Sequence, residues 1–554
     1  MWSKLHLSRP GLRIETVVLL ATIYMVALTN SAWWSAVTDG RSYSSSGTWF
    51  FIAACFCALV ALHFAIIAPI ANRWTVKPLL SLILVAAAAA SYFIRTYSVV
   101  LDPTMLQNVI QTDAREAKDL ITGSFIVNTL VASLVPVVGL WWVRIDQRTW
   151  MRAFGFRLAC IALSLVVAVI SIMAVSRDLT SLLRNQRELR YLITPGNVLI
   201  GLARNAVGTV RVAAGPRKAI GTDARIRGGT EMRKPRLIVL VLGETARAEN
   251  FSLLGYSRET NPELAKLNVI SYRNVKSCGT STAVSVPCMF SRSGRGDYDE
   301  QVIRQSEGLL NVLARAGYVV KWLDNQSGCK GVCEGNGIEY RKLEETTNSS
   351  LCVAGECLDE ILVTALRRDL EETQADTVIV LHMMGNHGPA YFKRYPENFR
   401  KFVPDCRTAQ LRDCERSQIV NTYDNAILYT DHVLANLISS ISERSDSIDT
   451  AFLYVSDHGE SLGENGLYLH GIPYLFAPSQ QTHVPMIAWY SQGLLQSAGL
   501  DESCVRVGAD APLSHDNLFD TVLGLADVES SIYDPKKDFL RPCRAQSEPG
   551  VDAS

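Results

Sequence analysis

The amino-acid sequence predicts a protein of two parts: an α-helical membrane domain with five transmembrane helices, and an external α/β domain with a largely parallel sheet. The first third of the 554-residue chain contains five long apolar stretches, and the remainder alternates short apolar runs with helical patterns. The composition agrees, because 48% of the residues are hydrophobic and only 19% are charged, against roughly 25% in soluble proteins.

Each of the five apolar stretches approaches or reaches the length that crosses the hydrocarbon core of a bilayer, about 20 residues. They are Val17–Val37, Trp49–Ala71, Trp74–Ile94, Phe125–Val143 and Leu158–Val175. Five such runs are too many for the core of a small soluble domain, so we interpret them as membrane spans. We do not expect the first to be cleaved as a signal peptide, because it is too long and other spans follow it.

The distribution of basic residues predicts the orientation of these spans. The N-terminal segment and the loops after the second and fourth spans carry nine Lys and Arg residues, whereas the alternate loops carry four. Because basic loops stay in the cytoplasm, the N-terminus is expected there. Five spans then place everything after Val175 outside the cytoplasm.

Cysteine usage supports an external location for the second part. Ten of the 13 cysteines fall between Cys278 and Cys543, as expected for a disulfide framework in an oxidising compartment. A structural zinc site is the alternative, but no couple has CxxC spacing. Nearest-neighbour pairing would join Cys278 to Cys288, Cys329 to Cys333, Cys352 to Cys357 and Cys406 to Cys414, leaving the pairing of Cys504 and Cys543 open.

We therefore expect three segments: a transmembrane domain at residues 1–176, a membrane-surface connector and linker at 177–234, and a catalytic domain at 235–554. Lys and Arg total 54, as do Asp and Glu, so no basic excess indicates a nucleic-acid partner.

Four predicted strands of the external domain end on residues that bind metals or phosphate. The runs Leu237–Leu242, Val319–Leu323, Thr377–Leu381 and Ala451–Val455 lead into Glu244, Asp324-Asn325, His382 and Asp457-His458. Binding sites of parallel α/β sheets form at the carboxyl ends of strands. Glu244, Asp457 and His458 would suit a divalent metal of the zinc or manganese type, and His387 and His470 a second metal or a phosphate.

A candidate nucleophile lies in the hydroxyl-rich segment Ser277–Ser291, which Cys278 and Cys288 bracket. A helix starting near Thr282 would direct free N–H groups at an anion. A metal-bound hydroxyl loses its proton easily and becomes a nucleophile. The residues alone do not choose among Thr280, Ser281, Thr282 and Ser285.

Five segments resemble the lipid A phosphoethanolamine transferases, which include the mobile colistin resistance enzymes and belong to the alkaline phosphatase/sulfatase superfamily. They are GETARAENFSLLGY (243–256), SCGTSTAVSVPCMFS (277–291), DNQSGCKGVC (324–333), MGNHGPAYFKRYP (384–396) and SDHGESLGENGLYLHG (456–471). The resemblance covers nearly the whole chain. It implies five spans and a periplasmic catalytic domain of the alkaline phosphatase/sulfatase type.

The resemblance also implies roles for individual residues. Thr282 would be the nucleophile and a zinc ligand, with Glu244, Asp457 and His458 as the other zinc ligands. His387, His470 and Lys330 would contact the substrate phosphate, the two histidines alternatively an additional zinc. Asn108, Thr112 and Glu116 would be polar substrate contacts in a lipid-entry loop.

The implied activity is transfer of phosphoethanolamine from phosphatidylethanolamine to a phosphate of lipid A or lipooligosaccharide at the bacterial inner membrane. It would proceed through a covalent adduct on threonine, and the product surface would carry less negative charge and resist polymyxin and cationic peptides. The alternative is a related transferase that moves phosphoglycerol, or that modifies a core sugar or another glycan.

Overall fold

A computed structural model describes residues 9–112, 114–146, 148–212, 216–227, 233–343, 350–353 and 355–545. The chain divides into two compact units. The membrane unit comprises Met1–Gln107 and Ile121–Ala206, and the sheet unit comprises Asn108–Leu120 and Val207–Ser554.

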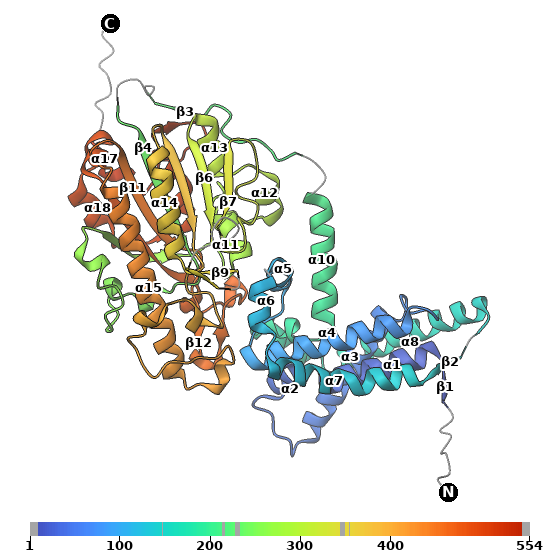
Figure 1. Ribbon diagram of the computed structural model, residues 1–554. Coiled ribbons are helices and arrows are strands. Elements are labelled where there is room, and N and C mark those ends of the chain that lie inside the picture. Colours follow the sequence, from blue (N-terminus) through green and yellow to red (C-terminus); the bar gives the residue numbers. More distant parts are fainter. Residues whose placement is uncertain are drawn as a thin grey trace. The chain divides into compact units, whose positions relative to one another are not determined.

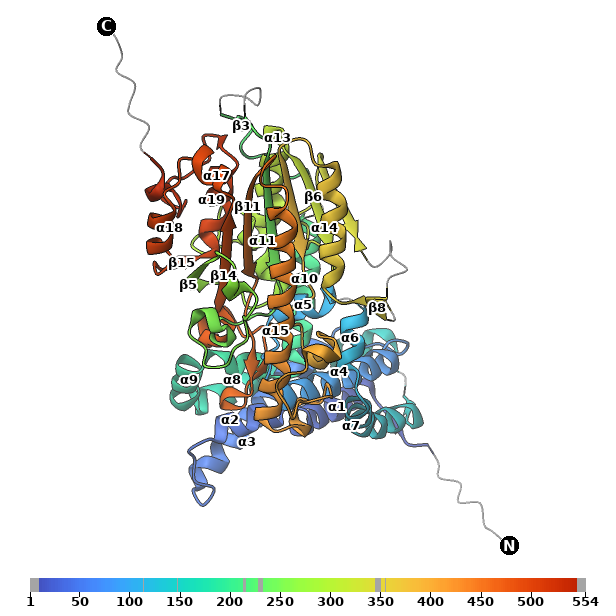
Figure 2. The ribbon, with the colours of Figure 1, turned by 60° about the vertical axis from the view of Figure 1, so that its left-hand side comes forward.

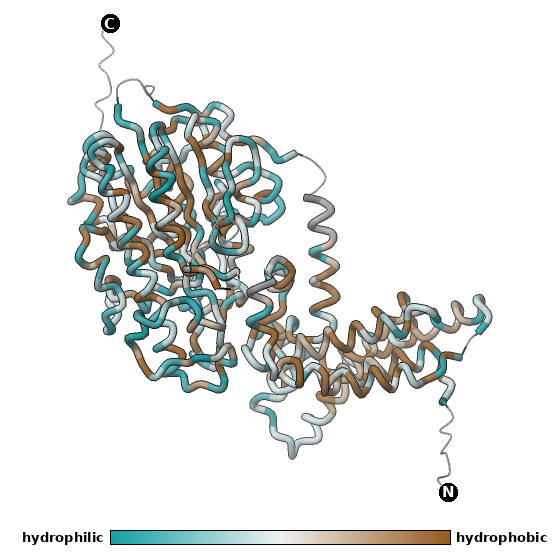
Figure 3. The backbone as a smooth tube through the Cα atoms, viewed as in Figure 1, coloured by the Kyte–Doolittle hydropathy of each residue, from teal (hydrophilic) through white to brown (hydrophobic). Residues whose placement is uncertain are grey.

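Four helices of the membrane unit are long and apolar enough to cross a bilayer. They are α3 (Ser46–Ile67), α4 (Val76–Tyr97), α7 (Gly123–Trp142) and α8 (Trp150–Ala174), and their apolar character is visible in Figure 3. Large apolar side chains on α7 and α8 are mostly exposed, as expected of surfaces that face lipid. The prediction of an apolar, membrane-spanning helical region is confirmed.

The first predicted span is a bent pair of helices. Helices α1 (Ile14–Leu28) and α2 (Ser31–Thr38) meet at an angle of 58°, so the described residues contain four spans, or five if this pair counts as one. Asn30 lies at the break, where its side-chain amide donates to the carbonyl of Met25 at 3.0 Å. Its side-chain oxygen accepts from the backbone N–H of Thr194 at 2.7 Å. These polar contacts replace the helical hydrogen bonds that the bend removes.

Shorter elements precede, separate or follow the spans along the chain. In the membrane unit these are α9 (Ser176–Asn185), η1 (Arg187–Leu192) and the pair of short strands β1 (Gly11–Leu12) and β2 (Arg144–Ile145). Helices α5 (Pro103–Gln111) and α10 (Gly196–Val212) each contain residues assigned to both units. Helix α6 (Ala114–Leu120) belongs to the sheet unit.

The sheet unit is built around eight strands in the order β15-β5-β14-β11-β4-β10-β6-β7. Strands β11, β4, β6 and β7 are labelled in Figure 1. Their bounds are β4 Arg236–Gly243, β5 Ile270–Lys276, β6 Val319–Asp324, β7 Ile338–Lys342, β10 Thr377–His382, β11 Asp449–Ser456, β14 His483–Tyr490 and β15 Leu513–Ser514. Only β14 runs against its two neighbours. The predicted, largely parallel α/β sheet is confirmed, and the four predicted strands are β4, β6, β10 and β11.

Strands β4, β10 and β11 are buried along their whole length, because helices cover both faces of the sheet. Alternate residues of β4, including Ile238 and Leu240, pack in one cluster with helices α13 (Leu309–Ala316) and α19 (Leu518–Leu525). Figure 2 shows α14 (Glu360–Glu372) and α15 (Arg416–Ser442) covering the sheet as neighbours.

The remaining elements lie around this core. They are α11 (Thr282–Met289), α12 (Glu300–Gln305), α16 (Ser479–Thr482), α17 (Gln492–Ser497), α18 (Glu502–Gly508) and the short strands β3 (Arg225–Ile226), β8 (Cys352–Val353), β9 (Glu356–Cys357), β12 (Ser461–Leu462), β13 (Tyr468–Leu469) and β16 (Val528–Glu529).

All ten cysteines of the sheet unit are paired in the structure. The disulfides are Cys278–Cys288, Cys329–Cys333, Cys352–Cys357, Cys406–Cys414 and Cys504–Cys543. Cys55, Cys57 and Cys160, in the membrane unit, are free. The last pair joins the two cysteines whose pairing the sequence left open.

Candidate active site

Two adjacent strands of the sheet bring the predicted ligands together. In the parallel pair of β4 and β11, Gly243 lies opposite Ser456. Glu244 is the first residue after β4, and Asp457 and His458 are the first two residues after β11. The carboxyl ends of both strands therefore deliver two carboxylates and one imidazole to the same place.

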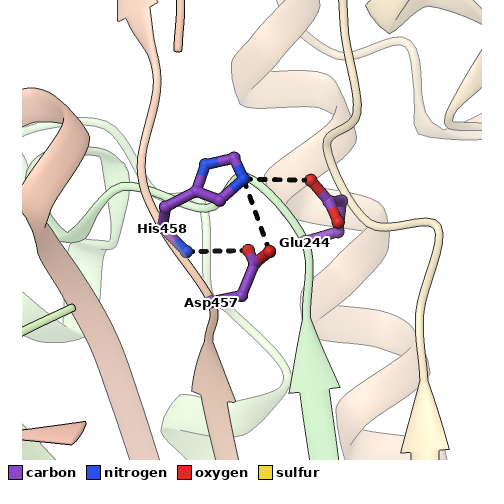
Figure 4. Close-up of side chains that lie close together, drawn as sticks. All are labelled: Glu244, Asp457 and His458. Atoms are coloured by element: carbon purple, nitrogen blue, oxygen red, sulfur yellow. Dashed lines mark hydrogen bonds and ion pairs between the residues drawn. The ribbon is translucent and has the colours of Figure 1, made fainter. Parts of the chain in front are cut away.

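Glu244, Asp457 and His458 form a fully buried cluster in which each offers one ligand atom, all within 4.8 Å of one another (Figure 4). The Nε2 atom of His458 lies 3.5 Å from Oε1 of Glu244 and 3.4 Å from Oδ2 of Asp457. Burial opposes protonation of His458, but the two carboxylates raise the pKa of the ring above its usual value. The cluster needs positive charge, and a divalent cation would supply it.

The surroundings orient this donor set for a metal. The Nδ1 atom of His458 lies 2.9 Å from the carbonyl oxygen of Gly459, which assigns the proton to Nδ1 and leaves the lone pair of Nε2 facing the carboxylates. The backbone N–H groups of Thr245 and His458 donate to Oδ1 of Asp457. Oδ2 of Asp457 is buried and has no hydrogen-bond partner among the described residues. These residues fit a bound zinc-type ion.

The hydroxyl of Thr282 faces the cluster. Its Oγ1 atom lies 3.1 Å and 3.3 Å from the two carboxylate oxygens of Glu244, and 3.3 Å from Nε2 of His458. Thr282 is 5% exposed and is the first residue of α11, where the helix dipole favours an anion. The structure thus brings Thr282 into the cluster, whereas Thr280 donates its hydroxyl proton to the carbonyl of Ile472 and Ser285 to that of Asp457.

A glycine allows the loop after β10 to lie against Glu244. Gly385 has a φ of +52°, and a Cβ atom at this position would stand 2.6 Å from the carbonyl oxygen of Glu244. The adjacent Asn386 donates its backbone N–H to the same carbonyl at 3.0 Å. This close approach fixes the start of the segment that carries His387.

His387 and His470 lie beside the cluster. The ring centroids of His458 and His470 are 4.3 Å apart, and those of His387 and His470 are 6.1 Å apart. Burial lowers the pKa of both His387 and His470 to about 3, so both imidazoles are neutral at physiological pH. Neutral imidazoles can each accept one hydrogen bond and donate another.

Two further residues of this site were missed by sequence reasoning. Gln326 donates from Nε2 to Oε2 of Glu244 at 3.0 Å. Glu460 is fully buried, and neither of its carboxylate oxygens has a hydrogen-bond partner among the described residues, although Nδ1 of His470 is 3.3 Å away. Burial raises the pKa of Glu460 well above its usual value. Gln326 lies in the DNQSGCKGVC motif and Glu460 in the SDHGESLGENGLYLHG motif, so their place in these motifs was the one signal that could have identified them as site residues.

Lys330 lies on the same loop as Gln326 but contacts other groups. Its Nζ atom donates to the carbonyl and hydroxyl oxygens of Ser327 at 3.2 Å and 2.7 Å. With Arg217 and Arg304 it lines a cavity of about 600 Å³. Among the described residues, no hydrogen bond or ion pair connects Lys330 to Glu244, Asp457 or His458.

The predicted lipid-loop residues are only partly described. Asn108 lies in α5, and Thr112 donates its hydroxyl proton to the carbonyl of Asn108 at 2.7 Å. Glu116 is in α6, but its side chain lies outside the described residues. No described contact brings Asn108 or Thr112 to the cluster, so their role stays a prediction.

Comparisons with known proteins extend over both units. Residues 236–528 match the family described as Sulfatase, and residues 59–209 match Phosphoethanolamine transferase EptA/EptB. Phosphoethanolamine transferase EptA of Escherichia coli K12 is 38% identical over 549 residues, which are 98% of this chain and 99% of that protein. Phosphatidylethanolamine transferase Mcr-1 of Escherichia coli is 39% identical over 477 residues, covering 85% of this chain and 87% of that protein.

A solved structure agrees with these matches. The integral membrane protein lipooligosaccharide phosphoethanolamine transferase A (EptA) from Neisseria meningitidis superimposes with a TM-score of 0.90 and 37% sequence identity. The superposition covers 97% of this chain and 100% of that one. The family resemblance carried by the five motifs is therefore confirmed: the chain belongs to the EptA/EptB family of phosphoethanolamine transferases, with a sulfatase-type domain that holds the buried cluster.

Proposed function

We propose that this protein transfers phosphoethanolamine from phosphatidylethanolamine to a phosphate of lipid A or lipooligosaccharide, with Thr282 as the nucleophile. The observation that carries the proposal is the Thr282 hydroxyl, which lies within 3.3 Å of both Glu244 and His458 in a buried cluster suited to a metal. The names of the relatives support the transferred group and the acceptor.

Zinc is the metal that we propose for the cluster, held by Glu244, Asp457, His458 and the oxygen of Thr282. Two carboxylates, one imidazole and one further oxygen are a ligand set that zinc accepts. When bound, the ion would supply positive charge that lowers the pKa of the Thr282 hydroxyl and offsets charge on the phosphate.

The protein's own residues then perform two displacements at phosphorus. Oγ1 of Thr282 gives up its proton and attacks the phosphorus of the donor lipid. The bond from phosphorus to the glycerol oxygen breaks, and that oxygen leaves with a proton as diacylglycerol. An oxygen of the acceptor phosphate next attacks the phosphoethanolamine–threonine adduct, and Thr282 regains its proton. His387, His470 and Lys330 would hold the phosphoryl oxygens, the imidazoles through hydrogen bonds.

Glu460 provides a reason for ethanolamine as the transferred headgroup. Burial disfavours the ionised form of the Glu460 carboxyl, so a bound cation that pairs with it would stabilise that form. The ammonium group of ethanolamine has the charge and the three donors that such a carboxylate needs. A glycerol headgroup would offer hydroxyls but no compensating charge.

The membrane topology completes the proposal. We place residues 1–176 in the bacterial inner membrane with a cytoplasmic N-terminus, residues 177–234 at the membrane surface, and residues 235–554 in the periplasm. Asn108, Thr112 and Glu116 would guide the lipid substrate. A phosphatase reporter fused after Leu242 should be active and one fused after Arg148 inactive, and the reverse result would contradict this orientation.

The biological result would be a less anionic outer surface. A phosphate capped with phosphoethanolamine gains an ammonium group, so polymyxins and cationic peptides bind it less well. The test uses the purified full-length enzyme with phosphatidylethanolamine or phosphatidylglycerol as donor, and mass spectrometry of the lipid A product. Mass gain from phosphatidylethanolamine alone supports the proposal. Transfer from phosphatidylglycerol, or modification of a core sugar only, would favour the alternative transferase.

A further inference from the structure

We propose that Tyr474–Phe476 (η10) forms a contact surface for the phospholipid bilayer beside the nucleophile. Leu475 is 75% exposed and Phe476 is 37% exposed. Across the described residues of 216–545, they are the only exposed large hydrophobic side chains other than valines and one tyrosine. Single exposed apolar residues are ordinary on protein surfaces, but two consecutive ones in a segment otherwise poor in them need a partner.

The segment is held directly to the loop that carries the nucleophile. The backbone N–H of Gly471 donates to the carbonyl of Thr280 at 2.8 Å, and the hydroxyl of Thr280 donates to the carbonyl of Ile472 at 2.7 Å. The phenol of Tyr474 donates to the carbonyl of Ser277 at 2.9 Å. A surface that binds η10 is therefore held close to Thr282 by these hydrogen bonds.

The chemistry next to the apolar pair matches the interfacial zone of a membrane. The guanidinium of Arg295 lies 4.0 Å from the ring centroid of Tyr474, and its Nη1 atom donates to the carbonyl of Cys278. No carboxylate of the described residues forms an ion pair with Arg295, so its charge is available to anionic lipid headgroups. Segments at the lipid–water boundary of a membrane typically combine apolar side chains such as leucine and phenylalanine with nearby tyrosine and arginine.

A bilayer fits this surface better than a protein partner does. Two apolar side chains are too small an area for a stable protein interface, which needs about 800 Å² on each side. Shallow insertion into lipid needs no such area, and the chain's own spans keep a bilayer within reach. The inference rests on the proposed function, because contact with the bilayer would bring donor lipid to Thr282.

The test compares donors that do and do not require the membrane surface. The full-length enzyme is placed in nanodiscs of phosphatidylcholine, with either long-chain phosphatidylethanolamine in the bilayer or monomeric dihexanoyl-phosphatidylethanolamine in solution. The double variant Leu475→Ser/Phe476→Ser should release diacylglycerol from the bilayer donor roughly 10-fold more slowly than wild type, as expected if shallow insertion buries, over the two side chains together, about the area of one large side chain. Its rate on the soluble donor should stay within about twofold. Val507→Ser, at an 80% exposed valine, is the matched control and should change neither rate.

A second readout does not depend on activity. Benzoylphenylalanine introduced in place of Leu475 should crosslink to phospholipid on illumination, whereas the same probe in place of Val507 should not. Equal loss on both donors, or no loss on either, would overturn the proposal, as would crosslinks to a second copy of the chain. If wild-type enzyme used neither donor, the proposed function would fail, and the crosslinking result would still decide the membrane contact.

Discussion

Replacing Thr282 tests the nucleophile directly. Thr282→Ala removes the hydroxyl that lies within 3.3 Å of both Glu244 and His458 and that would attack phosphorus, so transfer should fall by about 1,000-fold or more, roughly 4 kcal/mol in barrier. Glu244, Asp457 and His458 remain, so the variant should still bind metal.

Thr282→Ser should keep measurable activity, and the number of staggered rotamers sets the size of the loss. The threonine methyl restricts rotation about χ1, whereas serine samples three staggered rotamers. If one of three positions the oxygen at the cluster, the rate falls by about threefold, which is about 0.6 kcal/mol. Thr280→Ala should be milder than Thr282→Ala, because the Thr280 hydroxyl only supports the carbonyl of Ile472.

The assay follows the covalent step and the product separately. Without acceptor lipid, incubation with phosphatidylethanolamine should add phosphoethanolamine to the wild-type peptide that contains Thr282, and mass spectrometry should find no adduct in the alanine variant. Metal content measured on the same samples excludes loss of the cluster as the cause. Near wild-type transfer by Thr282→Ala would refute both the nucleophile and the two-step mechanism.

Three further predictions follow from the structure. Glu460→Gln should raise the KM for phosphatidylethanolamine by about 10–100-fold, because it removes the carboxylate that would pair with the ammonium group, and an unchanged KM in steady-state assays would remove Glu460 from headgroup binding. Replacing Cys278 and Cys288 with serine should lower stability by about 2–3 kcal/mol and also reduce kcat, whereas the matched Cys504/Cys543 pair should affect the melting temperature alone; equal kcat losses would argue against a role in positioning. Burial raises the pKa of Asp431 to about 7, so between pH 4 and 7 the folded carboxyl keeps a proton that the unfolded one releases, and stability should fall as pH rises, by up to roughly 4 kcal/mol. Asp431→Asn has no carboxyl group to titrate at this position, so its melting temperature relative to wild type should increase from pH 5 to pH 8. A constant difference in melting temperature would contradict the raised pKa of Asp431.

The sheet core could be predicted because its strands carry a strong signal. Strands buried on both faces are continuous apolar runs, and each of the four predicted ones lies within a strand of the structure. The rule that sites form at the carboxyl ends of parallel strands then placed Glu244 beside Asp457 and His458. Strands β5, β7, β14 and β15 were not predicted. Strands β5, β7 and β15 are short or only partly buried, and Pro485 interrupts the apolar run of β14.

The sequence did not predict the geometry of the loops, even within the motifs. The DNQSGCKGVC segment contains both Gln326 and Lys330, but the spacing does not show which side chain turns toward the cluster. The structure directs Gln326 to Glu244 and Lys330 to Ser327. Similarly, no charged residue interrupts the first apolar run, so its composition did not reveal the bend at Asn30, where the side chain hydrogen-bonds to the backbone of the distant Thr194. Such contacts depend on tertiary structure, which local pattern does not encode.

The Cys278–Cys288 bridge ties the loop that carries Thr282 to the redox state of its compartment, because such bridges form and persist where thiols are oxidised. A chain kept under reducing conditions would have Thr282, the proposed nucleophile, on a helix that this bridge no longer fastens. With the proposed topology, formation of this disulfide after export would also complete the candidate active site. Cells that fail to oxidise exported thiols should therefore contain the polypeptide without the proposed transferase activity.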